Sequence, residues 1–198
     1  MNVDEIRSFL ALELPTDVVR FLEDIINRLK RSGADVKWVN PNSIHLTLKF
    51  LGNINRSRIM EIRTSLNPIL SVRPELELET TAVGAFPSLN QPRVIWVGVK
   101  EICGNAELVK IVSQVEEAFY QMGFDKETKS FTPHLTLGRA RTSRGKGELA
   151  ALINSTKSNV KLRFVVNRAV LFQSILERTG ALYRELSTFE FKKTGFTD

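Results

Sequence analysis

Apolar and polar residues alternate along several segments of the chain. A period of two predicts β-strands, because successive side chains of a strand point to opposite faces. The segments that read as strands are residues 6–14, 36–39, 75–86 and 93–100. Two further apolar runs, also expected to be strands, cover residues 44–51 and 131–137. At the C-terminal end, residues 160–176 and 181–191 are predicted to form a long hairpin around residues 178–180.

Other segments repeat their apolar residues every three or four positions, which predicts amphipathic helices. One begins after Pro15, with Thr16 as its expected N-cap, and ends at Gly33. Further helices are predicted over residues 55–70, 105–122 and, as a shorter one, 145–156. Because helices alternate with strands, a parallel α/β sheet competes with an α+β fold. We expect α+β with mainly antiparallel sheets.

The predicted elements repeat along the chain. The strand that starts at Ile6 is followed by one helix and reaches His45, and the strand that starts near Val94 is followed by one helix and reaches His134. The two intervals are about 40 residues each, a spacing typical of duplicated supersecondary units. We therefore expect two pseudo-symmetric lobes, each a mainly antiparallel sheet with helices on its outer face. Residues 1–198 would form a single bilobal domain with a cleft between the lobes.

Both histidines of the chain lie in identical tetrapeptides, His-Leu-Thr-Leu at residues 45–48 and again at 134–137. In a strand the histidine and threonine of each copy share one face, while the two leucines anchor the other face in a core. A structural role for both histidines is a poor explanation of two identical motifs at matched positions in a repeat. Facing lobes would bring His45, Thr47, His134 and Thr136 together across the cleft.

Paired imidazoles suit general acid–base catalysis, because the ordinary pKa of histidine is ~6.5 and one ring can be neutral while the other is protonated. The threonine hydroxyls can donate hydrogen bonds to an anionic oxygen held between them. Such a site is suited to charge that develops on a phosphoryl group. It needs no metal if the phosphorus is easily attacked, as in a strained cyclic phosphodiester, although other anions fit the same pattern.

Composition adds limits to this picture. A hydrophobic content of 42% and a charged content of 25% are ordinary for a globular protein. No apolar run is long enough to cross a bilayer, and residues 1–7 do not resemble a secretory signal. The single cysteine, Cys103, is expected to fill the core of a protein in a reducing compartment, so we predict a cytoplasmic protein. We expect a monomer, because both lobes of the site belong to one chain.

Metal and nucleotide cofactors are not indicated. Two histidines in separate strands and one cysteine give no zinc-ligand spacing, and the glycine-rich phosphate-binding motifs of nucleotide cofactor sites do not occur. The net charge is +6, and residues 139–168 contain eight basic residues and only one acidic residue, Glu148. This positive stretch begins directly after the second motif and either attracts an anionic ligand or forms a solvated basic face.

The paired motifs resemble those of the two-histidine (2H) phosphoesterase superfamily. Within it, SIHLTLKFLG (residues 43–52), TPHLTLGR (132–139) and the opening strand FLALELP (9–15) are similar to the bacterial and archaeal RNA 2′,3′-cyclic phosphodiesterases, historically called 2′-5′ RNA ligases. The resemblance covers most of the chain. It implies a bilobal α+β fold and hydrolysis of a terminal RNA 2′,3′-cyclic phosphate to a 2′-phosphate, without metal or cofactor.

The resemblance also assigns roles. It implies that His45 and His134 are the acid–base pair, that Thr47 and Thr136 hold phosphate oxygens, and that Arg139 binds phosphate. Our preference is His134 as base and His45 as acid, although pseudo-symmetry prevents the sequence from deciding. Phe50 matches an aromatic that contacts the nucleoside in the family. Strict alternation places Phe50 opposite His45, so this role requires a bulge, and core packing is the competing role.

Two rival functions remain. The paired motifs could serve an RNA-binding module that docks a terminal phosphate without catalysis, as the basic stretch suggests. Alternatively, 2′-5′ joining of RNA ends could be the main activity of the same acid–base pair. The substrate is expected to be RNA with a 2′,3′-cyclic phosphate end or a small cyclic nucleotide, and the sequence does not identify the physiological RNA.

Overall fold

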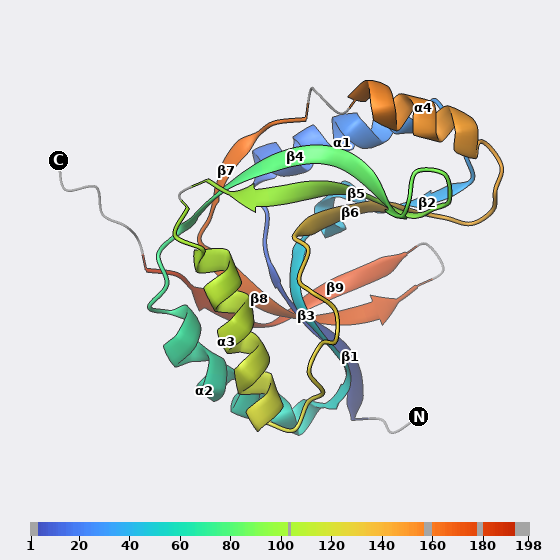
Figure 1. The fold of residues 1–198 in the computed structure, drawn as a ribbon. Helices are drawn as coiled ribbons and strands as arrows, with labels where there is room; N and C mark the ends of the chain where they lie inside the picture. Colours follow the sequence, from blue (N-terminus) through green and yellow to red (C-terminus); the bar gives the residue numbers. More distant parts are fainter. Residues whose placement is uncertain (1–3, 103, 157–159, 178–179, 193–198) are drawn as a thin grey trace.

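The computed structural model describes residues 4–102, 104–156, 160–177 and 180–192. Cys103 and the expected turn residues 178 and 179 lie outside these ranges. Within the described residues, nine strands form one curled sheet that four α-helices flank (Figure 1). Neighbouring strands of the sheet are antiparallel throughout. The α+β prediction is confirmed and the parallel α/β alternative is excluded.

Most elements lie close to the positions predicted from the spacing of apolar residues. The strands are β1 (Glu5–Leu12), β2 (Val36–Trp38), β3 (Leu46–Asn55), β4 (Leu76–Pro87), β5 (Pro92–Glu101), β6 (His134–Ala140), β7 (Arg163–Val166), β8 (Arg168–Leu176) and β9 (Ala181–Glu190). The helices are α1 (Thr16–Lys30), α2 (Ile59–Leu70), α3 (Glu107–Gln121) and α4 (Lys146–Thr156). Two short 3-10 turns, η1 (Pro41–Ser43) and η2 (Arg56–Arg58), precede β3 and α2. Thr16 is not the N-cap of α1, because it is the first helical residue and the extended Pro15 precedes it.

The sheet order reveals the predicted duplication. The order is β7-β4-β5-β6-β3-β1-β8-β9, with β2 paired separately to β6. Outward from the centre, β6, β5 and β4 on one side mirror β3, β1 and β8 on the other. The two halves join through one residue pair, Leu46 opposite Leu135, which are the first leucines of the two motifs. The pseudo-symmetry axis therefore runs between the two His-Leu-Thr-Leu segments.

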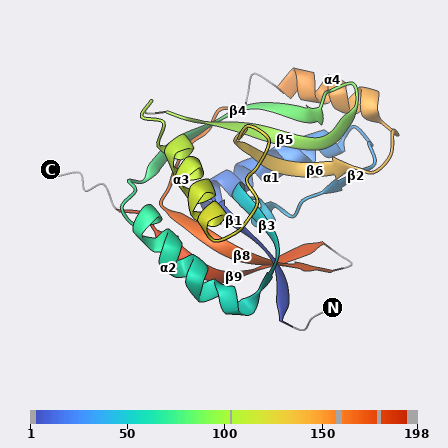
Figure 2. The same ribbon diagram turned by 60° about the horizontal axis from the view of Figure 1, so that its bottom comes forward.

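The helices are exchanged between the halves of the sheet. Helix α3 follows β5, yet it packs on β3 and on α2 in the other half, while α1 follows β1 and packs against α4. Figures 1 and 2 show α1 and α4 beside β4, β5 and β6, and show α2 and α3 beside β1, β3, β8 and β9. Each lobe thus combines elements from both repeats. Because of this exchange, the packing of each lobe depends on elements of both repeats.

One strand prediction is wrong. Residues 160–176 do not form a single strand, because Asn167 separates β7 from β8. Strand β7 pairs with β4 at one end of the sheet, and β8 pairs with β1 near the other end. Only β8 and β9 form the predicted hairpin. The alternation of Phe164 and Val166 stops at the two polar residues Asn167 and Arg168, and an apolar pattern carries no information about which strand is the partner.

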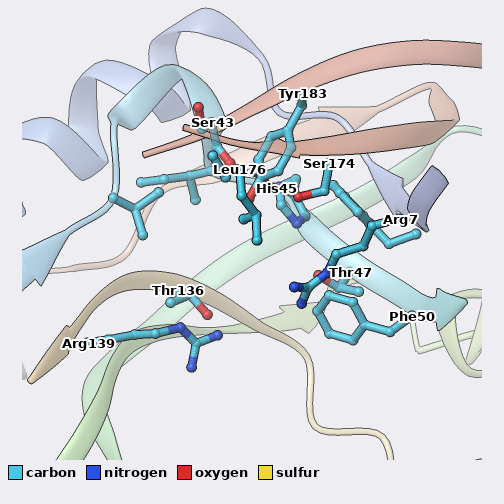
Figure 3. A pocket seen from close by; sticks show the side chains of 14 residues that line it. Arg7, Ser43, His45, Thr47, Phe50, Thr136, Arg139, Ser174, Leu176 and Tyr183 are labelled. Carbon is cyan, nitrogen blue, oxygen red and sulfur yellow. Dashed lines mark hydrogen bonds between the residues drawn. The ribbon is translucent and has the colours of Figure 1, made fainter. Parts of the chain in front are cut away.

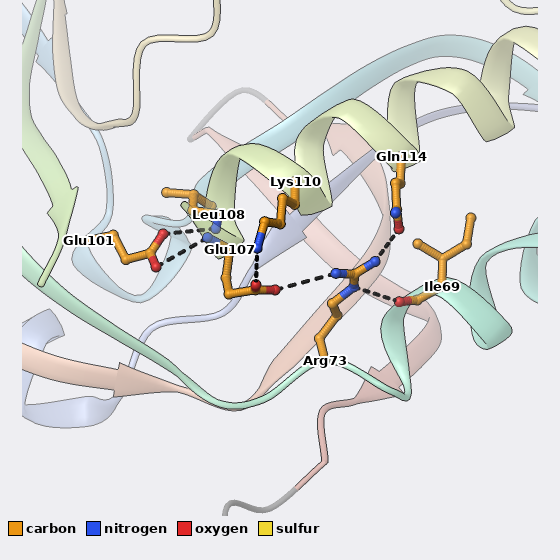
Figure 4. A network of polar contacts seen from close by, with 7 residues as sticks. All are labelled: Ile69, Arg73, Glu101, Glu107, Leu108, Lys110 and Gln114. Atoms are coloured by element: carbon orange, nitrogen blue, oxygen red, sulfur yellow. Dashed lines mark hydrogen bonds and ion pairs between the residues drawn. The ribbon is translucent and has the colours of Figure 1, made fainter. Parts of the chain in front are cut away.

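Two polar clusters hold α3 in place. The Glu101 carboxylate accepts hydrogen bonds from the N–H groups of Glu107 and Leu108, which caps the N-terminus of the helix (Figure 4). Arg73, which follows α2, donates hydrogen bonds to the Ile69 carbonyl, to Glu107 and to Gln114, so it connects α2 to α3.

In the described residues, no helix has both the length and the apolar character needed to cross a membrane.

Candidate active site

A bulge in β3 arranges the first motif. Ala11 of β1 is opposite Thr47 and Leu10 is opposite Lys49, so Leu48 is an extra residue in the pairing. The extra residue reverses the alternation beyond it. Lys49 therefore faces the core, and Phe50, opposite Phe9, lies on the same face as Thr47. The bulge that a binding role for Phe50 requires is present.

Strand β6 repeats the bulge at the equivalent position. Trp96 of β5 is opposite Thr136 and Ile95 is opposite Gly138, which leaves Leu137 as the extra residue. Val94 is then opposite Arg139, on the same face as Thr136. Phe50 and Arg139 are each five residues beyond their motif histidine. The two bulges bring both residues to the cleft face, which a strict period of two does not predict.

Phe50 does not pack in the core. Its side chain is 57% exposed, which contradicts the core-packing alternative. Its cleft-facing ring lies 6.0 Å from the ring of Phe9, centroid to centroid. An exposed phenyl ring beside a polar pocket is available to contact a ligand.

His45 is held in a buried aromatic setting just before β3. Its Nδ1 lies 2.9 Å from the Ser43 carbonyl oxygen, which can only accept a hydrogen bond, so Nδ1 carries a proton and Nε2 is free for chemistry. The imidazole stacks on Phe9 at 4.5 Å and meets the Tyr183 ring edge-on at 5.2 Å. Burial lowers the pKa of His45 to about 4, against a smaller opposing effect of the Ser43 hydrogen bond. His45 is therefore neutral near pH 7.

His134 has the same backbone hydrogen bond and different neighbours. Its Nδ1 lies 2.7 Å from the carbonyl oxygen of Thr132, so its Nε2 is also free. The edges of Phe86 and Trp96 meet the imidazole at 5.2 and 6.5 Å. Trp96 lies flat against the backbone of Gly84 and Gly98, where any Cβ would collide with the indole ring or with Thr81. These two glycines leave room for the aromatic support beneath His134.

The structure brings five of the six predicted site residues together around one pocket of about 220 Å³. Figure 3 shows His45, Thr47 and Phe50 on one side of this pocket and Thr136 and Arg139 on the other. The sixth residue, His134, lines an adjoining groove that shares Thr47 and Phe50 with the pocket. The lobes therefore meet at a shared cleft. We refer to the two cavities as the phosphate pocket and the groove.

The sequence analysis missed several residues that line the phosphate pocket. Arg7 of β1 reaches into it beside Thr47 and Phe50, and Tyr183 of β9 lies over His45 (Figure 3). Burial raises the pKa of Tyr183, and the positive charges of Arg139 and Arg7 oppose that rise. Arg7 shares a strand face with Phe9, which is the one signal in the sequence that could have placed it. The position of Tyr183 depends on the hairpin and had no such signal.

The pocket is electropositive, but only the first residue of the basic stretch is among the described residues that line it. Its described lining contains Arg7 and Arg139 and no carboxylate. Of the basic residues between 139 and 168, Arg139 is the one that lines it. Arg163 pairs with Glu79 on β4, and Arg168 pairs with Glu13 near β1. Lys157 lies outside the described residues. Arg139 thus supplies the positive charge that the stretch predicted at this site.

No group of three or more His, Cys, Asp or Glu side chains is placed to hold a metal ion, within the described part of the chain. The chemistry that the site supports comes from its own side chains. It offers two imidazoles with free Nε2 atoms, the hydroxyl groups of the two motif threonines and two guanidinium groups. These are the groups that bind an anionic phosphoryl group and move protons at its oxygens.

Comparison with protein families shows which family the chain belongs to. The family model described as "LigT like Phosphoesterase" matches residues 12–96 and 101–183. The chain belongs to the LigT-like phosphoesterase family. Each matched segment contains one His-Leu-Thr-Leu motif, as expected from a duplication.

Curated relatives match nearly the whole chain. The RNA 2′,3′-cyclic phosphodiesterase of Archaeoglobus fulgidus is 33% identical over 185 residues, which cover 93% of this chain and 99% of that protein. The protein of the same name from Methanocaldococcus jannaschii is 32% identical over 177 residues, covering 89% and 96%. The family resemblance inferred from the motifs is confirmed.

Solved structures agree with the fold. The protein TT0787 of Thermus thermophilus superposes with a TM-score of 0.78 at 21% identity, covering 96% of this chain and 100% of that one. Escherichia coli LigT complexed with 3′-AMP gives a TM-score of 0.71 at 20% identity, covering 94% and 98%. At these identities the likeness supports the fold of this LigT-like chain, and its chemistry must be argued from its own residues.

Proposed function

We propose that this protein hydrolyses the terminal 2′,3′-cyclic phosphate of RNA to a 2′-phosphate, without a metal ion. The observation that carries the proposal is the pair of histidines with free Nε2 atoms, one from each motif, at a cleft that holds two threonines and Arg139. Relatives at about one-third identity carry the name RNA 2′,3′-cyclic phosphodiesterase. A cyclic phosphate end or a small cyclic nucleotide is the expected substrate.

The two histidines divide the proton transfers. Water attacks phosphorus, its proton passes to the base, and the acid protonates the ribose 3′ oxygen as the bond from that oxygen to phosphorus breaks. The low pKa of His45 keeps its Nε2 unprotonated, which suits a base. A bound phosphate anion raises the pKa of an adjacent imidazole and so strengthens that base. We therefore assign His45 as base and His134 as acid, the reverse of the preference drawn from the sequence.

The remaining predicted residues bind the substrate in this proposal. The hydroxyl groups of Thr47 and Thr136 donate hydrogen bonds to the nonbridging phosphate oxygens from opposite lobes. The guanidinium of Arg139 neutralises the negative charge that develops on them. Phe50 offers its exposed ring to the terminal nucleoside.

A product assay tests the proposal. The protein is incubated with an oligoribonucleotide that ends in a 2′,3′-cyclic phosphate, in the presence of a chelator, and the end is identified as cyclic, 2′-phosphate or 3′-phosphate. We expect complete conversion to the 2′-phosphate. Retention of the cyclic end contradicts the proposal and favours the rival RNA-binding module. A joined RNA that accumulates in place of the hydrolysed end favours 2′-5′ ligation.

We further propose a domain organisation, an oligomeric state and a location for the protein. The two lobes act as one domain in this proposal, because the sheet continues across them and both supply residues to the site. A monomer suffices, because one chain completes the site, and light scattering in solution measures its mass. An RNA substrate and a single cysteine are consistent with a cytoplasmic location.

A further inference from the structure

Apart from Thr47, Phe50 and His134, the residues that line the groove beside His134 have no role in the chemistry described above. The groove has a volume of about 770 Å³, within the range typical of small-molecule binding sites. Its walls are one face of α3, the start of β3 and the segment 127–134, which leads into β6. The groove is more than three times as large as the phosphate pocket, and the two join at Thr47 and Phe50.

The lining of the groove suits an uncharged aromatic ring. Its walls carry three phenyl rings and an exposed helical valine, namely Phe50, Phe86, Phe131 and Val109. Val109 is 60% exposed, which is unusual for a valine on an amphipathic helix.

The charges of the groove balance, in contrast with those of the phosphate pocket. Lys49 and Lys129 line it together with Glu116 and Glu127. Lys49 and Glu116 neutralise each other in an ion pair of 2.8 Å. An RNA phosphate gains little from such a lining, whereas a nucleobase gains apolar contact and stacking on aromatic rings.

We propose that the groove binds the base of the nucleotide that precedes the cyclic end of the RNA. This inference rests on the proposed function. Both ester oxygens of the cyclic phosphate belong to the terminal ribose, so the terminal nucleoside is fixed beside the histidines. The groove continues from His134 along α3 past Val109 and Glu116, which are about 10 Å apart on the helix. The next base along the strand reaches this part of the groove.

The proposal predicts a preference for length. We compare kcat/KM for a mononucleoside 2′,3′-cyclic phosphate with kcat/KM for a dinucleotide that ends in the same cyclic phosphate. Stacking of one base on an aromatic ring corresponds to about 5-fold to 150-fold in binding. We expect the dinucleotide to be favoured about tenfold or more, whatever its terminal base.

Two variants examine the groove itself. Val109→Glu replaces an apolar contact with a carboxylate that repels RNA. Because Val109 is exposed, we expect this variant to keep its fold. Phe131→Ala removes a stacking surface. The matched control is Val72→Glu, because Val72 is 62% exposed and lies outside the groove. We expect the dinucleotide-to-mononucleotide ratio of kcat/KM to fall about tenfold in both groove variants and to keep its wild-type value in the control.

The outcomes separate this inference from the proposed function. A wild-type ratio of kcat/KM values in Val109→Glu overturns the inference, whether the two values are unchanged or fall by the same factor. An equal fall places the effect at the terminal nucleoside. A wild-type protein that hydrolyses neither substrate overturns the proposed function instead. Calorimetric titration with the mononucleotide and dinucleotide 2′-phosphates then decides the groove by binding alone. Tighter dinucleotide binding that Val109→Glu abolishes supports the groove, and equal affinities overturn it.

Discussion

The two His-Leu-Thr-Leu segments have the same local structure in different surroundings. In both, Nδ1 of the histidine bonds to the carbonyl two residues earlier, and the second leucine is the extra residue of a bulge. Beyond the bulge the copies diverge. Lys49 and Phe50 of the first correspond to Gly138 and Arg139 of the second. The first copy presents an aromatic ring to the cleft, and the second presents a positive charge.

The neighbours of the two histidines differ as well. His45 stacks on Phe9 under Tyr183, and this burial lowers its pKa to about 4. His134 meets the edges of Phe86 and Trp96 at the mouth of the groove. The comparison teaches that a duplicated motif supplies identical chemical groups, whereas the surrounding elements give each histidine its own environment.

The largest expected effect follows removal of either imidazole. His45→Ala and His134→Ala should each lower kcat about 10²-fold to 10⁴-fold, because each removes one proton transfer of the proposed mechanism. Steady-state kinetics on a cyclic-ended RNA measures the loss, and circular dichroism of each variant checks that the fold is kept. Either variant retaining more than a tenth of the wild-type kcat would show that one motif is dispensable.

The next effect concerns Lys49, which follows the first motif at the position where Gly138 follows the second. Lys49 is 3% exposed, and its Nζ donates to Glu116 and to the Asp125 carbonyl, so it joins β3, α3 and the segment before β6. Lys49→Met leaves the Glu116 carboxylate without this partner and should lower the free energy of unfolding by about 3 kcal/mol or more.

Urea unfolding measures this change. The control is Lys126→Met, which breaks the exposed pair with Glu117 and should cost about 1 kcal/mol or less. Similar losses in the two variants would mean that burial of the Lys49 pair contributes nothing to stability.

The third prediction concerns pH. Unfolded His45 binds a proton as the pH falls below ~6.5, whereas folded His45 does so only near 4, so folding is disfavoured progressively between these values. The loss of stability from this group should reach on the order of 3 kcal/mol at pH 4 and level off within about one pH unit below it. The measurement is urea unfolding between pH 7 and 4 for the wild type and for His45→Gln. We expect a steeper fall in the wild type, and parallel curves would contradict the lowered pKa.

The smallest effect contrasts the two residues that follow the bulges. Arg139→Ala removes a charge from the phosphate pocket and should raise KM about tenfold or more, because charge-assisted hydrogen bonds contribute about 1.5–3 kcal/mol. Phe50→Ala should raise KM less and, unlike Arg139→Ala, should leave the salt dependence of KM as it is in the wild type. Initial rates at several salt concentrations distinguish the two, and equal salt slopes in both variants would refute the contrast.

Local patterns predicted much of this molecule. The four helices, the strands before and after them and the repeat follow from apolar spacing, because burial of one face is a local requirement. The two identical motifs predicted that both histidines lie at a shared cleft, and the structure places them there. The separate partners of β7 and β8 did not follow, because strand pairing depends on residues far away in the chain.

The sequence by itself determined which chemical groups the protein has and that they come in two copies. The tertiary structure decided how those groups differ. Two bulges turned Phe50 and Arg139 into the cleft, Arg7 and Tyr183 arrived from other strands, and burial under Tyr183 made His45 a neutral base in our proposal. Register and desolvation are properties of the packed sheet, and identical tetrapeptides carry no record of either.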